Sequence, residues 1–160
     1  MATENDYATL INNIKDDVAS IGRKYGLKLI LLHGSFAAGT ATSESDLDIV
    51  ILGRSKPTVD QFMKIHHEFA QMLADIDPAR ELDLTTLHRA DPLFCFQVAQ
   101  KSLLLYGTSD DYHEFLSYAF KFYMDSGDLF ELERTQVLKF QKYLNEKYLS
   151  DQRVVEHHAD

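Results

Sequence analysis

The chain has 160 residues and a formal net charge of −9, from 16 basic and 25 acidic residues. This length indicates one principal domain, able to bury about two thirds of the surface that its unfolded chain exposes. The acidic balance argues against broad nucleic-acid binding, which needs basic surface to neutralise phosphates.

The single cysteine, Cys95, excludes an intramolecular disulfide and a multi-cysteine zinc site. Its apolar neighbours Phe94 and Phe96 indicate a buried structural thiol. The polar N-terminus lacks the apolar core of a signal peptide. No apolar stretch approaches the ~20 residues that span a bilayer. We therefore expect a cytoplasmic protein without membrane contact.

In the first half of the chain, apolar residues at helical spacing predict a helix over residues 5–24. The apolar run 27–33 predicts a strand that leads into Gly34-Ser35. Residues 36–45, rich in small and polar side chains, predict a short helical turn and a loop. The run 47–52, ended by Gly53, predicts a second strand.

In the second half, Pro57 opens a long amphipathic helix that Asp77-Pro78 stops. Polar and apolar residues alternate over 81–87, as in a half-buried strand. Asp91-Pro92 starts a third helix, expected to run to about residue 105 and to end at Gly107. Residues 110–149 read as helical, with a kink near Ser126-Gly127.

These elements predict an α/β (α+β) fold in which helices flank one small mixed sheet. We expect a core over residues 1–108, a helical extension over 109–150 packed on that core, and a polar tail over 151–160.

The segment from Gly34-Ser35 to Asp46-Leu47-Asp48 carries the most specific chemistry. A Gly-Ser turn after a strand can offer backbone N–H groups and a hydroxyl to a phosphate. Asp46 and Asp48, two residues apart, point to the same face of a strand. Carboxylate oxygens suit Mg²⁺, which fills its remaining positions with water and substrate phosphate.

Asp83 adds a third carboxylate, because its neighbours in the later strand point to the opposite face. Three converging carboxylates repel one another unless cations neutralise them. The sequence therefore predicts a metal site formed by Asp46, Asp48 and Asp83.

The stretch GSFAAGTATSESDLDIVIL, with Asp83 in ELDLTTL, resembles the polymerase β-like nucleotidyltransferase superfamily. It looks most like the minimal nucleotidyltransferases, whose signature is Gly-Ser, ten residues, Asp-x-Asp, and a third acid on a following strand. The resemblance covers roughly residues 8–106. Chain size and the helical C-terminal part resemble the antitoxin members that are paired with HEPN-domain toxins.

This resemblance implies a role for each residue of the motif. Gly34 and Ser35 would bind the phosphates of a nucleoside triphosphate, with ATP the expected substrate. Asp46, Asp48 and Asp83 would be the catalytic residues and the ligands of two Mg²⁺ ions. An acceptor hydroxyl would then attack the α-phosphate, with pyrophosphate leaving.

One position departs from the family pattern. Family members often read Gly-Ser-x-Ala-Arg-Gly, whereas Ala38 stands where that arginine would be. The loop thereby lacks a cation near the phosphates, a change that weakens the expected affinity for triphosphate. Arg54, Lys56 or a residue of a partner are candidates to replace it.

His33 precedes the Gly-Ser turn, and we expect it to stiffen the loop through a hydrogen bond rather than to act in catalysis.

Aromatic residues are dense toward the C-terminus, and they cannot all face one side of a helix. A helical core accounts for many of them, and the others form an exposed surface that suits a protein partner or self-association. The residues are Tyr112, Phe115, Tyr118, Phe120, Phe122, Tyr123, Phe130, Phe140, Tyr143 and Tyr148.

Three functions remain open at this point. The resemblance favours an Mg²⁺-dependent enzyme that transfers AMP from ATP to a tyrosine of a cognate HEPN toxin, acting as its antitoxin. A second possibility keeps the chemistry but changes the acceptor to a small molecule such as an aminoglycoside. The third is a non-catalytic antitoxin that neutralises its partner by binding alone.

Overall fold

The computed structural model describes the backbone of residues 4–156 and the side chains of residues 9–147. By compactness the chain divides into two units, residues 1–121 and 122–160. This boundary lies inside helix α5 (Ser109–Asp125), whereas the sequence placed the end of the core just before that helix.

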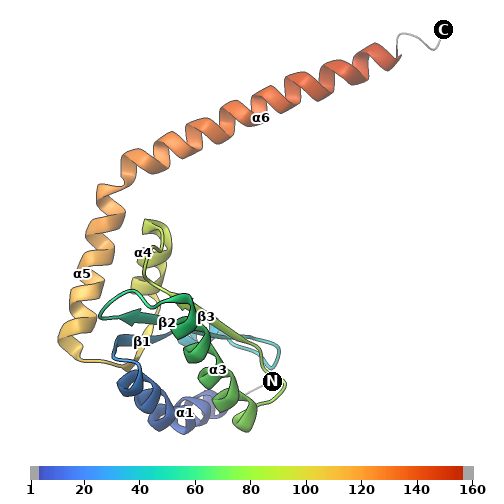
Figure 1. Ribbon diagram of the computed structural model, residues 1–160. Coiled ribbons are helices and arrows are strands. Elements are labelled where there is room, and N and C mark those ends of the chain that lie inside the picture. Colours follow the sequence, from blue (N-terminus) through green and yellow to red (C-terminus); the bar gives the residue numbers. More distant parts are fainter. Residues whose placement is uncertain (1–3, 157–160) are drawn as a thin grey trace. The chain divides into compact units, whose positions relative to one another are not determined.

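A four-stranded mixed sheet forms the centre of the first unit (Figure 1). Its strands are β1 (Leu27–His33), β2 (Leu47–Gly53), β3 (Leu82–Thr86) and β4 (Leu103–Tyr106), in the order β3-β2-β1-β4. β1 is antiparallel to both β2 and β4, and β2 is parallel to β3. The predicted α+β class with a small mixed sheet is confirmed.

Helices α1 (Glu4–Lys24) and α3 (Val59–Ile76) contact each other and pack on one face of this sheet (Figure 1). Apolar residues from both helices and from alternate strand positions form the main core between them. At its edge, the Tyr25 hydroxyl donates a 2.6 Å hydrogen bond to Glu68 of α3. α3 begins after Thr58, which forms a reciprocal capping box with Gln61 that satisfies free backbone N–H groups.

The other face of the sheet carries the intervening strand residues, because side chains alternate along a strand. Leu31 and Val50 are buried on this face. Buried residues Cys95 and Val98 of α4 (Pro92–Gln100) and Phe115 of α5 supply further apolar contacts in this unit. The prediction that Cys95 is a buried thiol is confirmed.

Two predicted elements differ from the structure. The third helix ends at Gln100 rather than near residue 105, and residues 103–106 form the edge strand β4, which pairs with β1. A short apolar run such as Leu103-Leu104-Leu105 fits a strand as well as a helix, so periodicity alone did not separate the two. In addition, Gly34 and Ser35 are the first residues of a short helix, α2 (Gly34–Ala38), rather than a turn before it.

The second unit consists of the end of α5 and the long helix α6 (Gly127–Glu156). The predicted interruption near Ser126 is confirmed, and the Ser126 hydroxyl donates to the carbonyl of Phe122 at 2.7 Å. α6 continues past residue 149, where the helical pattern was expected to end. Residues 157–160 of the predicted tail lie outside the described residues.

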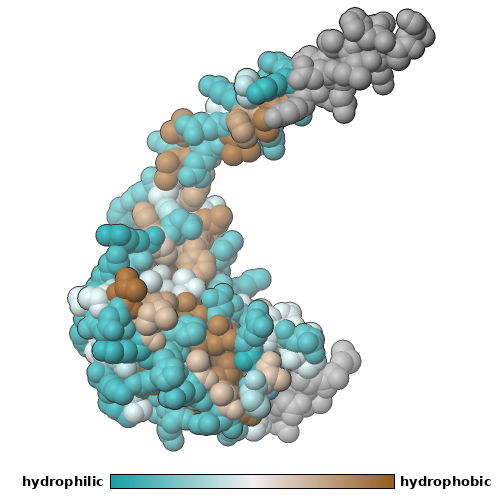
Figure 2. Space-filling model, turned by 45° about the vertical axis from the view of Figure 1, so that its right-hand side comes forward, coloured by the Kyte–Doolittle hydropathy of each residue, from teal (hydrophilic) through white to brown (hydrophobic). Residues whose placement is uncertain are grey.

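Apolar side chains on α6 are widely exposed (Figure 2). Phe140 is 61% exposed and Tyr143 is 55% exposed, which bears out the expected aromatic surface; the side chain of Tyr148 lies outside the described residues. Over the part of the chain that is described, no helix combines the length and apolar character that crossing a membrane requires.

Candidate active site

Gly34 lies where β1 passes into α2, and two observations explain why this residue is glycine. Its backbone φ is +69°, in the left-handed region that side chains with a Cβ rarely adopt. A Cβ at this position would stand 2.1 Å from the carboxylate oxygen Oδ2 of Asp48. The turn therefore packs its backbone directly against one of the predicted catalytic carboxylates.

Ser35 follows in the first turn of α2, where backbone N–H groups have no partner within the helix. Its carbonyl accepts a 2.9 Å hydrogen bond from the Thr40 N–H, and Gly39, at φ +70°, ends the helix. The segment 34–40, the Gly34 loop, is thus a single short turn of helix that the hydrogen bond from Thr40 closes. Its N–H groups at Gly34 and Ser35 are of the kind that binds phosphate oxygens in proteins.

Asp48 and Asp83 are register partners in the parallel pair of β2 and β3. Neighbouring strands lie about 4.8 Å apart, and register partners place their side chains on the same face. The two carboxylates therefore share the sheet face opposite the core residues Leu47 and Ile49. Sequence positions 35 residues apart are brought together in this way.

Burial, as the main cause, raises the pKa of the Asp48 carboxyl above its usual value near 3.8. The negative charges of Asp83 and Asp46 raise it further, while His33 opposes them. Negative charge thus accumulates beside the Gly34 loop, in the position where a cation is most stabilising.

Asp46 lies just before the first residue of β2 and is exposed. On either side of it, the Ser45 carbonyl accepts a hydrogen bond from Arg80, and the Leu47 N–H donates to the Glu81 carbonyl at 2.9 Å. Asp46 is therefore placed by the loop that leads into β2, whereas Asp48 is placed by the sheet.

His33 makes a polar side-chain contact, as expected, although its partner lies beyond α4 and not in the Gly34 loop. Its Nδ1 lies 3.2 Å from the carbonyl oxygen of Lys101, and its ring meets that of Phe94 edge to face with 5.9 Å between centroids. These contacts fix the end of β1 against α4 and the residue that follows that helix.

The structure places two of the three suggested replacements for the missing arginine, Arg54 and Lys56, away from the candidate site. Arg54 and Lys56 follow Gly53 at the far end of β2, about 20 Å along the strand from Asp48 at ~3.3 Å per residue. Arg80, which the sequence reasoning did not single out, instead lies over the ring of Phe36 in α2, 4.9 Å from its centroid. The sequence offers a hint of the position of Arg80 only in its spacing of three residues from Asp77, with which it forms an ion pair.

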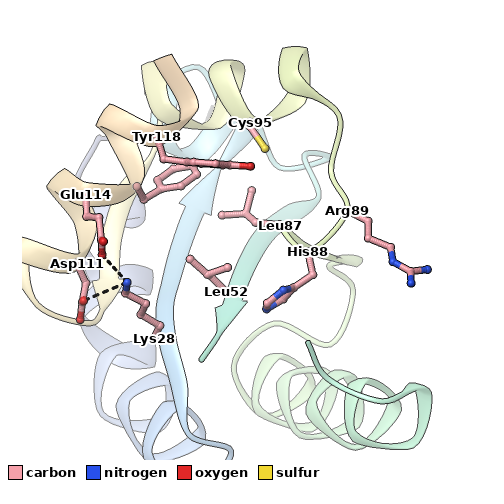
Figure 3. Close-up of a pocket in the computed structure, with 10 residues that line it drawn as sticks. Lys28, Leu52, Leu87, His88, Arg89, Cys95, Asp111, Glu114 and Tyr118 are labelled. Atoms are coloured by element: carbon pink, nitrogen blue, oxygen red, sulfur yellow. Dashed lines mark hydrogen bonds and ion pairs between the residues drawn. The ribbon is translucent and has the colours of Figure 1, made fainter. Parts of the chain in front are cut away.

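A separate pocket of about 360 Å³ lies at the opposite end of the strands (Figure 3). Leu52, Leu87 and Tyr118 contribute much of its apolar lining. At one side Lys28 pairs with Glu114 at 2.5 Å and with Asp111 at 3.5 Å. The predicted site residues are not part of its lining.

A family model described as "Polymerase beta, Nucleotidyltransferase" matches residues 16–111, more than half of the chain. The chain belongs to this nucleotidyltransferase family.

One curated relative of this chain is the "Protein adenylyltransferase MntA" of Shewanella oneidensis. The two are 36% identical over 85 residues, which is 53% of this chain and 58% of the relative. The chain thus spans little more than half the length of the curated relative that it matches.

Two solved structures are similar to this nucleotidyltransferase in fold. One, a toxin-antitoxin with AMP-PNP, has 25% identity and a TM-score of 0.61 over 80% of this chain and 98% of its own. The other contains a tri-AMPylated Shewanella oneidensis HEPN toxin in complex with MNT antitoxin. It has 20% identity and a TM-score of 0.59, and covers 82% of this chain and 98% of the matched chain.

The donor set of this nucleotidyltransferase fits a divalent cation such as Mg²⁺. Carboxylate oxygens are its preferred protein ligands, and burial, with the negative charges of Asp83 and Asp46, raises the pKa of the Asp48 carboxyl. Within the described residues, no three His, Cys, Asp or Glu side chains lie together as a complete metal-binding group. Mg²⁺ usually takes one or two protein carboxylates and completes its shell with water and substrate phosphate.

Proposed function

We propose that this chain is an Mg²⁺-dependent protein adenylyltransferase that transfers AMP from ATP to a tyrosine of a HEPN-type toxin and so acts as its antitoxin. The observation that carries the proposal is the register pairing of Asp48 with Asp83 beside the Gly34 loop, in a chain of the nucleotidyltransferase family. The name of the curated relative supports the choice of AMP and of a protein acceptor.

The proposed reaction is an in-line substitution at the α-phosphorus of ATP. The acceptor oxygen forms a bond to phosphorus and the bond to the pyrophosphate oxygen breaks. The hydroxyl proton passes to the Asp83 carboxylate, from which it is released to water. Backbone N–H groups at Gly34 and Ser35 would bind the outer phosphates and hold the leaving group in place. Asp46, Asp48 and Asp83 would hold two Mg²⁺ ions, which supply positive charge to the phosphate oxygens and activate the acceptor hydroxyl.

Position 38 favours a second candidate, an antitoxin that neutralises its partner without catalysis. Ala38 leaves this loop without the cation that the family pattern often carries there. The exposed apolar side chains of α6 would serve a partner in either case, because large exposed apolar surface marks protein–protein contacts.

Incubation with ATP labelled at the α-phosphate, Mg²⁺ and candidate acceptors separates the alternatives. The acceptors are a HEPN-type toxin protein and a panel of aminoglycosides. Label on a tyrosine of the protein supports the proposal, and label on a drug supports a small-molecule acceptor. Binding of the partner without label in any acceptor supports the non-catalytic antitoxin. The variant D48N is the control for label that does not depend on the site.

A further inference from the structure

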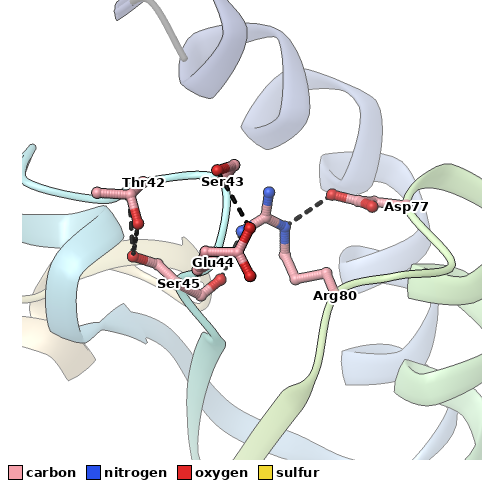
Figure 4. A network of polar contacts seen from close by, with 6 residues as sticks. All are labelled: Thr42, Ser43, Glu44, Ser45, Asp77 and Arg80. Carbon is pink, nitrogen blue, oxygen red and sulfur yellow. Dashed lines mark hydrogen bonds and ion pairs between the residues drawn. The ribbon is translucent and has the colours of Figure 1, made fainter. Parts of the chain in front are cut away.

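Arg80 lies outside the family motif, yet its side chain lies between Asp77 and the loop that precedes Asp46 (Figure 4). Its side chain is only 10% exposed. Its Nη1 donates to the Ser45 carbonyl at 2.5 Å, and its Nε donates to Asp77 Oδ2 at 2.9 Å. The guanidinium also lies over the ring of Phe36, 4.9 Å from its centroid.

The Ser45 carbonyl belongs to a tight turn directly before Asp46. The Ser45 side-chain oxygen accepts from the Thr42 N–H at 2.9 Å, and the Ser45 N–H donates to the Thr42 carbonyl at 3.2 Å. These bonds fix the turn internally. The bond from Arg80 fixes it to the rest of the unit.

Asp46 is therefore held between two hydrogen bonds that come from consecutive residues. Arg80 binds the carbonyl before it, and the Glu81 carbonyl binds the Leu47 N–H after it. The bond at Leu47 belongs to the start of the pairing between β2 and β3, which also aligns Asp48 with Asp83. The bond from Arg80 acts on the other side of Asp46, where it holds the Ser45 carbonyl of the preceding loop.

Phe36 extends the same connection to the phosphate-binding loop. It is buried and belongs to α2, whose first residues are Gly34 and Ser35. A guanidinium over an aromatic face is attractive, and a largely buried charge is retained only where such partners offset its loss of water. The Arg80 side chain thus touches both the loop that carries Asp46 and helix α2, which begins with Gly34 and Ser35.

We infer that Arg80 is a positioning residue for Asp46: it sets the distance between that carboxylate and the pair formed by Asp48 and Asp83. The inference rests on the proposed function of these carboxylates as ligands of a divalent cation. Arg80 acts through Ser45 and Phe36 and does not itself touch substrate. Lysine cannot reproduce this role fully, because only the planar guanidinium can bind two acceptors in a fork and stack on a ring.

Binding of Mn²⁺ alone, measured by electron paramagnetic resonance, tests the inference on the full chain without relying on activity. We expect R80Q to weaken Mn²⁺ affinity about tenfold, as is typical for partners that orient metal ligands, and R80K to lie between R80Q and the wild type. R54Q removes the same charge from the far end of β2 and is expected to leave affinity unchanged. Thermal unfolding of each variant shows whether it is folded.

Background variants make the test specific for Asp46. In D46N the ligand that Arg80 positions is absent, so R80Q should have no further effect on Mn²⁺ affinity. An equal loss in the wild-type and D46N backgrounds would overturn the inference, as would wild-type affinity in folded R80Q. If R80Q does not fold, D77N replaces it, because loss of the Asp77 contact loosens the same guanidinium and is expected to weaken affinity less than tenfold.

The same proteins distinguish failure of the inference from failure of the proposed function. If wild-type protein binds Mn²⁺ with the predicted dependence on Arg80 but transfers no nucleotide, the inference holds and the transferase proposal fails. If the wild type transfers nucleotide and R80Q requires no more Mg²⁺ for half-maximal rate, the inference fails and the function stands.

Discussion

Asp46 and Asp48 lie two residues apart in the sequence, yet different structures hold them. Asp48 is inside β2, aligned with Asp83 by the ladder of a parallel strand pair and packed against Gly34. Asp46 precedes the strand and depends on a loop tied down by Arg80. The sheet places Asp48 and Asp83 on one face of neighbouring strands, while Asp46 lies in a loop whose contacts come from outside the motif.

Removing both carboxylates tests the two modes of support together and has the largest expected effect. We predict that the double variant D46N/D48N loses nucleotidyl transfer by about a thousandfold or more, because the groups that gather cations at the developing charge are gone. The variant should keep the fold, since neither carboxylate forms part of the core. Transfer of labelled AMP and circular dichroism check the two halves of this prediction, and transfer near the wild-type rate would contradict the metal assignment.

Replacing Gly34 disturbs the sheet-held carboxylate Asp48 and the backbone of the Gly34 loop, but not Asp46. In G34A the new Cβ must displace the Asp48 carboxylate, and it also strains a left-handed backbone at a cost of about 1–3 kcal/mol. We expect transfer to fall about a hundredfold, the usual consequence of moving a catalytic group by ~1 Å.

G39A is the matched control for G34A. Gly39 has nearly the same φ, +70°, but a Cβ there meets nothing within 4 Å. It should show the backbone strain in thermal unfolding with much less loss of transfer. Equal losses in the two variants would mean that contact with Asp48 is not the cause.

His33 supports the same end of the sheet more weakly. H33A loses the contact with the Lys101 carbonyl and the edge-to-face packing on Phe94. We expect destabilisation of about 1 kcal/mol in urea unfolding, with only a few-fold loss of transfer. H67A, at an exposed position of α3, is the control. A loss in H33A as large as that of the double aspartate variant would assign this histidine a direct part in the chemistry.

These results also show which parts of the molecule the sequence predicts. The alternation around Asp48 and Asp83 was sufficient to place both on one face of neighbouring strands, because strand geometry leaves few choices. It did not distinguish the apolar run 103–106 as strand β4, which pairs with β1 some 70 residues earlier in the chain. Nor did it identify Arg80, whose contacts with Ser45 and Phe36 join residues with no characteristic spacing.

The smallest expected effect is a pH dependence of stability without metal. Because the pKa of Asp48 is raised in the folded state, its contribution to stability is fully present below its usual value near 3.8 and is lost as the pH rises through the folded value. The side chain of D48N does not ionise, so this variant should keep the contribution at every pH. Above the folded pKa of Asp48, the Tm of D48N should therefore exceed that of the wild type by no more than about 4 °C. Added Mg²⁺ should narrow the difference by stabilising the wild type, and a lower Tm for D48N at neutral pH would contradict the account.

We propose that Asp48 and Asp83, together with Asp46, hold divalent cations against the phosphates of a nucleotide beside Gly34. Anomalous diffraction from crystals grown with Mn²⁺ and a non-hydrolysable ATP analogue would locate these cations. We expect Mn²⁺ peaks in contact with these carboxylates and the phosphate oxygens. A nucleotide bound in this crystal with Mn²⁺ away from all three carboxylates would contradict it.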